Sequence, residues 1–249
     1  MKKENRIKAI VTGHSKGLGL GISRALLHRG HAVLGLSRNS HASLLQEFPG
    51  LMQECRIDLA DSAALHSAQF QATVAEFSRE ATQLFLVNNA GMVAPVGPLS
   101  AQSLPSIQTA VQLNIAAPLL LSALLVQQLE PQQQLGILHV SSGAGRSAYP
   151  GWAVYCATKA ALDMHATAVQ QDGLSNVRIC SLAPGVIDTD MQADIRNVDK
   201  GLFPNKARFV QLKQENQLTD PGKAGEKLVD YLLGRHFGRA AVDDLRQHG

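Results

Sequence analysis

Short apolar runs alternate along the chain with longer segments in which apolar residues recur at helical spacing. Consecutive apolar residues are typical of buried strands, whereas apolar residues three and four positions apart are typical of helices that cover a core. The pattern predicts strands at residues Ile7–Val11, Ala32–Leu36, Glu54–Ile57, Leu84–Val87, Gly136–Val140, Val177–Leu182 and Ala240–Val242. It predicts helices at residues Gly17–His28, His41–Phe48, Ser62–Arg79, Ser103–Leu113, Ile115–Leu129, Val154–Gln171 and Ala224–Leu233.

Strands that alternate with helices indicate an α/β protein built from βαβ units, with a parallel sheet and helices on both faces. No linker or break in composition divides the 249 residues, a length that suits one such domain. We therefore expect residues 1–249 to form a single doubly wound domain with about seven parallel strands. Residues 188–218 are polar and irregular with apolar residues interleaved, and we interpret them as a lid over a substrate.

Composition excludes several classes of function. The net charge is +3 and the basic residues are scattered, whereas a nucleic-acid-binding surface would concentrate them in one stripe. Cys55, Cys156 and Cys180 form no CxxC pair, which fits reduced thiols. The histidines show no zinc-type spacing, so we expect no metal site.

The apolar runs are short compared with those of membrane and secreted proteins. The longest candidate, Ala116–Val126, falls far short of the roughly 20 residues that cross a bilayer. The apolar run near the N-terminus is too short for a signal peptide. We expect a cytoplasmic protein with no membrane partner.

The stretch TGHSKGLG, residues 12–19, directly follows the first predicted strand. Ligands of doubly wound sheets bind at the carboxyl ends of the strands, where this turn lies. Gly13 can adopt backbone angles closed to other residues, and Gly17 and Gly19 leave room for a phosphate and for close packing. The helix that begins near Gly17 directs free N–H groups at such a phosphate. The spacing differs from the commoner G-x-G-x-x-G fingerprint, so an ordinary βα turn is the alternative.

Tyr155 and Lys159 lie four residues apart in a predicted helix, so their side chains share one face. A neighbouring ammonium favours the phenolate and lowers the tyrosine pKa, which suits a general acid–base. A surface pair without chemistry is the alternative. Ser142 follows a predicted strand and could donate to a carbonyl oxygen, with Ser141 as its rival. Neither serine lies in a GxSxG elbow, which argues against a hydrolase.

Together these motifs resemble the short-chain dehydrogenase/reductase family. Its cofactor turn is similar to Thr12-Gly13-x-x-x-Gly17-x-Gly19, its second motif to Asn88-Asn89-Ala90-Gly91, and a third to Pro184-Gly185-x-x-x-Thr189. The match runs from about residue 6 to residue 242. The stretches SSGAGRSAYPGWAVYCATKAAL and APGVIDTDMQADIR most resemble the sepiapterin reductase and benzil reductase branch. The resemblance implies a Rossmann fold and a nicotinamide cofactor that carries a hydride.

The resemblance also implies a catalytic set and an assembly. Ser142 would polarise a carbonyl, and Tyr155 would protonate the alkoxide as general acid. Lys159 would lower the tyrosine pKa and bond the nicotinamide ribose. Asn114 would hold a water that links Lys159 to solvent, or would cap a helix that starts at Ile115. Relatives usually pair through the helices at Ile115–Leu129 and Val154–Gln171, which implies a homodimer or homotetramer.

The end of the second predicted strand favours NADP(H) over NAD. NAD-binding relatives place an acid here to bind the ribose hydroxyls, but this chain has Ser37 and then Arg38. Arg38 can bind a 2′-phosphate, and Lys16 adds a second cation; two solvated surface charges are the alternative. The predicted cofactor contacts are Gly13, Ser15, Lys16, Gly17, Leu18, Gly19, Ser37, Arg38, Asp58, Leu59, Asn89, Ala90, Gly91, Tyr155, Lys159, Pro184, Gly185, Val186 and Thr189.

Small and apolar residues around Ser142 favour a compact apolar carbonyl substrate, with a diketone as the first choice. The predicted substrate pocket consists of Ser142, Ala144, Trp152, Val186 and Met191. An NADP-dependent carbonyl reductase is therefore the favoured function. The alternative is a non-catalytic dinucleotide-binding sensor or scaffold of the same fold, a class that typically lacks the tyrosine or the lysine.

Overall fold

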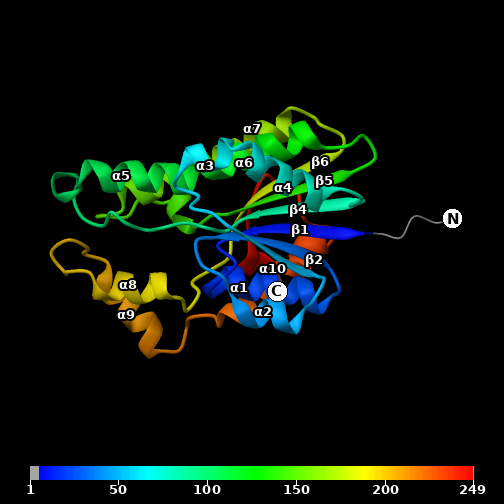
Figure 1. Ribbon diagram of the computed structural model, residues 1–249. Coiled ribbons are helices and arrows are strands. Elements are labelled where there is room, and N and C mark those ends of the chain that lie inside the picture. The colour runs from blue at the N-terminus through cyan, green and yellow to red at the C-terminus, as the bar shows by residue number, and fades with distance from the viewer. Residues whose placement is uncertain (1–5, 249) are drawn as a thin grey trace.

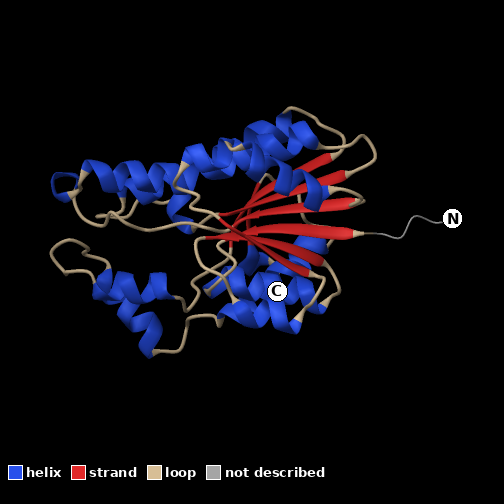
Figure 2. Cartoon of the chain, in the orientation of Figure 1, coloured by secondary structure: helices blue, strands red, loops and turns tan. Residues whose placement is uncertain are grey.

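The computed structural model describes residues 6–248 and contains a seven-stranded sheet between two layers of helices (Figures 1 and 2). The strand order is β3-β2-β1-β4-β5-β6-β7, and every neighbouring pair is parallel. The order reverses between β1 and β4, which confirms the predicted doubly wound α/β fold. Residues 1–5 and 249 of the predicted domain lie outside the described residues.

The elements follow the predicted alternation closely. The strands are β1 Ile7–Thr12, β2 Ala32–Ser37, β3 Met52–Arg56, β4 Gln83–Asn88, β5 Gln134–Val140, β6 Val177–Ala183 and β7 Val242–Asp244. The α-helices are α1 Gly17–His28, α2 Ala42–Glu47, α3 Ser62–His66, α4 Ala68–Ser78, α5 Leu104–Val111, α6 Ala117–Gln128, α7 Ala153–Gln171, α8 Asp190–Asn197, α9 Lys206–Gln214 and α10 Pro221–Leu233. Short 3₁₀ turns are η1 Leu99–Ala101, η3 Gly143–Gly145 and η4 Leu245–Gln247, and η2 Gln112–Ala116 is a π-helical turn.

Two apolar cores lie on opposite faces of the sheet. One core joins the sheet to α1, α2 and α10, and the other joins it to α3, α4, α6 and α7. Helices α1 and α10 approach closely because both present glycine at the contact. A Cβ on Gly21 would come within 2.2 Å of the Pro221 carbonyl oxygen, and one on Gly225 within 2.3 Å of the Gly21 carbonyl carbon. Helices α1 and α10 lie with α2 in the layer on one side of the sheet (Figure 1).

Four assignments differ from the prediction. The predicted helix Ser62–Arg79 is two helices, because Ser67 ends α3 and its hydroxyl caps α4 by accepting from the Phe70 N–H at 3.3 Å. Strand β3 starts earlier, at Met52, and β7 lies later than predicted. The segment 188–218 is not irregular, since it contains α8 and α9. A bridge between Ile187 and Thr219 closes the base of this segment.

Helices α5 and α6 are joined by the π-helical turn η2 into one continuous helix, Leu104–Gln128. Within its 25 residues, a stretch of 18 has a mean hydropathy of 1.8, so by length and composition the helix could cross a membrane, which the sequence analysis did not anticipate. Part of the helix packs in the core through Ala117, Leu121 and Leu125. A core helix passes the same length and composition test.

Candidate active site

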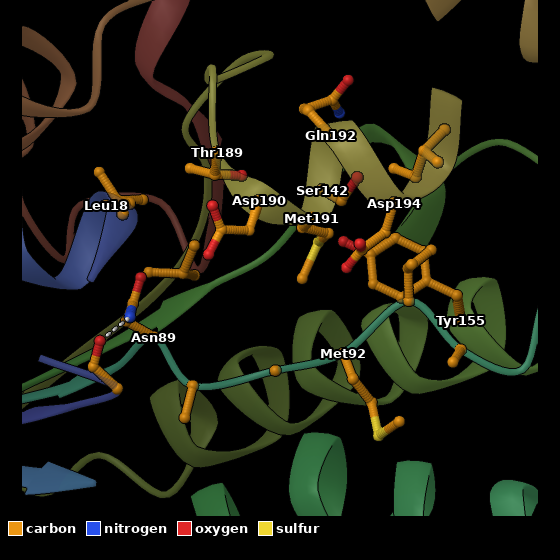
Figure 3. A pocket seen from close by; sticks show the side chains of 18 of the residues that line it. Leu18, Asn89, Met92, Ser142, Tyr155, Thr189, Asp190, Met191, Gln192 and Asp194 are labelled. Atoms are coloured by element: carbon orange, nitrogen blue, oxygen red, sulfur yellow. Dashed lines mark hydrogen bonds between the residues drawn. The ribbon is translucent and has the colours of Figure 1, made fainter. Parts of the chain in front are cut away.

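A cavity of about 1010 Å³ runs along the carboxyl ends of the strands and under α8 and α9. Residues that follow β1, β2, β4, β5 and β6 line one part of it, and helix α8 lines another. In the close-up, Ser142, Tyr155, Met191 and Asp194 surround a common space, with Asn89 at the far end (Figure 3). This is the strand edge at which doubly wound sheets bind their ligands.

The glycine turn is shaped to hold an anionic group at the start of α1. Gly13 and Gly17 have φ angles of 67° and 54°, in the left-handed region that favours glycine. No side chain caps the first turn of α1, so its N–H groups are free to bind a phosphate. The Asn89 amide braces the turn by donating to the Thr12 carbonyl at 2.9 Å. These features fit the pyrophosphate of a dinucleotide.

The structure brings the predicted cofactor residues together with one exception. All of them except Gly19 line the cavity. Gly19 lies behind the turn, where a Cβ would come within 2.2 Å of the Gly13 carbonyl oxygen, so its absence of a side chain allows α1 to pack against the turn.

Four of the five predicted substrate residues, Ser142, Trp152, Val186 and Met191, also line the cavity. The fifth prediction, Ala144, is wrong in its placement. Its side chain is buried in the apolar cluster that also contains Trp152 and Tyr155, and it does not line the cavity.

Tyr155 and Lys159 lie on the cavity face of α7, one helical turn apart. The Lys159 ammonium lies 5.7 Å from the centre of the tyrosine ring and donates to the Val140 carbonyl at 2.8 Å. The Ser142 hydroxyl interacts with the tyrosine hydroxyl, whereas the Ser141 hydroxyl donates to Asp163 at 2.7 Å. Ser142 is therefore the serine that is free to meet a substrate with Tyr155.

Asn114 is buried in the π-helical turn and does not line the cavity. Its side-chain oxygen accepts from the Met92 N–H at 2.9 Å, and its amide donates to the Met92 carbonyl at 2.8 Å and to the Thr158 hydroxyl at 3.2 Å. It does not cap a helix at Ile115, because the helix runs on without interruption. Asn114 fixes the loop after β4 beside Lys159.

Burial dominates the ionisation of the pair on α7. It raises the pKa of Tyr155 to about 12, with an opposing hydrogen bond from Ser142, and it lowers the pKa of Lys159 to about 8. The expected lowering of the tyrosine pKa is thus outweighed, because burial disfavours the charged phenolate. A phenol with a raised pKa holds its proton at neutral pH, as a proton donor requires.

The two cations predicted at the adenosine end differ in their surroundings. Arg38 lines the cavity and its side chain forms no ion pair within residues 6–248. Lys16 instead pairs with Asp190 of helix α8 at 2.7 Å. This exposed pair connects the glycine turn to the segment 188–218, and sequence spacing gave no sign of it.

Sequence reasoning missed several residues that line the cavity. Asp190, Gln192 and Asp194 come from α8, which was expected to be irregular (Figure 3). Arg246 comes from η4 near the C-terminus, where its guanidinium pairs with Asp244 at 2.5 Å. The sequence analysis assigned these positions no role, because the fold alone shows that they reach the cavity.

The chain matches known proteins over most of its length. A family model described as short chain dehydrogenase matches residues 8–200. The chain belongs to the short-chain dehydrogenase family. Benzil reductase from Bacillus subtilis is 36% identical, with 96% of this chain and 98% of that protein covered. Sepiapterin reductase from Xenopus laevis is 29% identical, with 91% of this chain and 90% of that protein covered.

A solved structure supports the same family assignment. A short-chain dehydrogenase/reductase from Burkholderia vietnamiensis is 47% identical, with a TM-score of 0.71 over 79% of this chain and 94% of the other. Membership of the family makes the chain an oxidoreductase that binds a nicotinamide dinucleotide. The benzil and sepiapterin reductase branch predicted from its motifs is confirmed.

Proposed function

We propose that this protein uses NADPH to reduce a carbonyl group of a small apolar diketone to an alcohol, with Tyr155 as general acid. The observation that carries the proposal is the meeting of Ser142, Tyr155 and Lys159 in the cavity that the glycine turn also lines. A dinucleotide-binding sensor or scaffold would not need this set, so the catalytic reading is the better supported one.

The side chains divide the chemistry of carbonyl reduction among them. The nicotinamide, when bound, supplies the hydride. Ser142 donates a hydrogen bond to the carbonyl oxygen and orients it, while the protonated Tyr155 hydroxyl transfers its proton to the same oxygen as negative charge develops there. The Lys159 ammonium then stabilises the phenolate left behind. The water that Asn114 was expected to hold stays a prediction.

The lining of the cavity near the tyrosine supports an apolar substrate. The lining here consists of Val93, Val96 and Trp152, together with Met191 and Ile195 of helix α8. Such a surface contributes binding energy in proportion to the apolar area that the substrate buries. The benzil reductases among the relatives are named for a compound of this kind, which agrees with a diketone.

A substrate screen tests the proposed function directly. Steady-state NADPH oxidation would be measured with aryl and alkyl diketones, quinones, pteridines, sugars and acyl-carrier thioesters. We expect the highest kcat/KM with a diketone. A higher value for sugars or acyl-carrier substrates would overturn the substrate class, and the absence of turnover with every carbonyl compound would favour the sensor.

Replacing Arg38 with aspartate tests the cofactor preference. The change removes a partner of the 2′-phosphate and places a like charge beside it, whereas NADH has no phosphate there. A lost charge-assisted contact is worth about 1.5–3 kcal/mol, so Kd for NADPH should rise roughly tenfold or more. Kd for NADH should change little. Fluorescence titration of both cofactors measures the two effects.

Arg56→Asp is the matched control. Arg56 lies at the end of the neighbouring strand, outside the cavity, and within residues 6–248 its side chain donates only to the Arg38 carbonyl. It carries the same charge change and should affect NADPH much less than Arg38→Asp does. Equal weakening of NADPH binding and NADH binding by Arg38→Asp would show that Arg38 does not bind the 2′-phosphate.

The assembly and location are part of the same proposal. Met164 on α7 and Val111 on α5 are 68% and 39% exposed, which supports pairing of subunits through this layer of helices as a homodimer or homotetramer. We place the enzyme in the cytoplasm and assign it a small-molecule carbonyl substrate, with neither nucleic acid nor membrane as a partner. Sedimentation equilibrium of the full chain tests the assembly.

A further inference from the structure

A buried carboxylate lies behind the catalytic residues and is used by none of the steps above. Asp163 follows Lys159 by one turn on α7, and its side chain is 11% exposed. Its Oδ1 atom accepts from the hydroxyls of Ser141 at 2.7 Å and Ser181 at 2.6 Å. One carboxylate therefore ties α7 to the ends of strands β5 and β6. A buried charge is stable only when it is bonded in this way.

Lys159 makes a second tie between the same two elements. Its ammonium donates to the Val140 carbonyl at 2.8 Å, so Val140 and Ser141, the two residues before Ser142, are both bonded to α7. Turn η3 follows directly and packs on the same stretch of helix. A Cβ on Gly145 would come within 2.8 Å of Asp163 Oδ2 and 3.0 Å of the Lys159 carbonyl carbon. The residues before and after Ser142 are thus both packed or bonded against α7, the helix that carries Tyr155.

Asp163 also sets the charge environment of the lysine. Its carboxylate raises the pKa of Lys159, against the burial that lowers it. The other titratable groups facing Lys159 are the Tyr155 phenol on the same helix and His139 on β5, whose pKa burial lowers to about 3. The loop after β4 presents the uncharged Gly91, and the π-helical turn η2 presents the uncharged Asn114. Arg146 follows turn η3, and its Nε atom lies 3.5 Å from Asp163 Oδ2. Its positive charge therefore counters the negative charge of the carboxylate.

We infer that Asp163 is a positioning residue that locks α7 to the end of β5 and keeps Lys159 charged for catalysis. The inference rests on the proposed function for the roles of Ser142, Tyr155 and Lys159. Asp163 itself contacts neither the substrate space nor the glycine turn, because it does not line the cavity. Its effect should therefore reach the reaction through Ser142 and Lys159.

Two variants with opposite effects on the lysine test the inference. Asp163→Asn keeps an acceptor oxygen and removes the negative charge, while Arg146→Met removes the opposing cation and keeps the apolar stem. The pH midpoint of the Lys159 Cε resonance would be followed by NMR in ¹³C-lysine-labelled protein and assigned by its loss in Lys159→Arg. We expect the midpoint to fall by about one pH unit in Asp163→Asn and to rise in Arg146→Met.

Kinetics supply the second readout. The pH at which kcat for diketone reduction declines should move in the same two directions. At pH 7, Asp163→Asn should lower kcat by about tenfold and leave Kd for NADPH within about twofold of wild type, because the residue does not touch the cofactor site. Asp172→Asn, an exposed charge change at the end of the same helix, is the control and should change neither quantity.

The outcomes separate the inference from the proposed function. A lysine midpoint that stays fixed in both variants, or that moves in one direction for both, would overturn the role of Asp163. A variant that merely loses stability would lower kcat equally at every pH, which also contradicts it. If Asp163→Asn does not fold, the test rests on Arg146→Met alone, through the direction in which the Lys159 midpoint shifts. If wild type reduces no diketone, the proposed function fails while the NMR titration still tests Asp163.

Discussion

Replacing Tyr155 with phenylalanine is expected to abolish nearly all reduction while cofactor binding stays intact. The ring is buried and packs 5.4 Å from the Trp152 ring, so the variant keeps its contacts and loses one hydroxyl. That hydroxyl is the proton donor of the proposed reaction, and a general acid contributes about 10²- to 10⁴-fold to the rate. We expect kcat to fall by a factor in this range, measured as NADPH oxidation with a diketone, with Kd for NADPH unchanged.

Tyr149→Phe is the matched control for this experiment. Tyr149 also lines the cavity, and its ring lies 5.4 Å from Trp152, so the control removes a second phenolic hydroxyl from the same wall. It should keep kcat near the wild-type value. If Tyr155→Phe retains a substantial fraction of kcat, or if the two variants lose activity equally, another group supplies the proton.

The fold could be predicted where local signals agree with the tertiary environment. Helix α1 runs from Gly17 to His28 as expected, because the glycine turn marks its start and its apolar spacing meets the core. Strand β3 was placed too late because polar residues hide its pattern. Its Glu54 side chain faces His14, with 2.8 Å between Oε1 and Nε2. Helix α8 was missed because its apolar Met191 and Ile195 stand among polar residues.

The candidate site was predictable to the extent that it follows strand ends. Parallel strands place their carboxyl ends at one edge, so motifs far apart in sequence were expected to meet there. No such rule predicts which side chains from other elements come into contact. The Lys16–Asp190 pair spans 174 residues, and the bond between Ser181 and Asp163 joins a strand to a helix with no motif at either position. These contacts are products of packing, so spacing along the chain does not reveal them.

Replacing Trp152 with alanine should detach the segment 188–218 from the catalytic helix and impair substrate binding more than cofactor binding. The Trp152 ring stacks on Phe203 of this segment, with 4.8 Å between centres and 12° between planes, and lies 5.3 Å from Phe209. Removing a buried tryptophan costs about 3–5 kcal/mol. Because the lost contacts are concentrated on one segment, local opening is the expected result. KM for the diketone should rise tenfold or more, whereas Kd for NADPH should change much less.

Limited proteolysis and kinetics together decide whether this segment is a lid. Cleavage between α8 and α9 should become faster in Trp152→Ala, and bound substrate should slow it. Trp152→Phe keeps an aromatic ring against Phe203 and should recover most of the loss, while Leu104→Ala, at a position 81% exposed outside the cavity, should behave as wild type. A variant that is cleaved faster but binds the diketone with unchanged KM would mean that the segment covers the site without contributing to substrate binding. The apolar face of α8, with Met191 and Ile195 toward the cavity, leads us to expect the opposite.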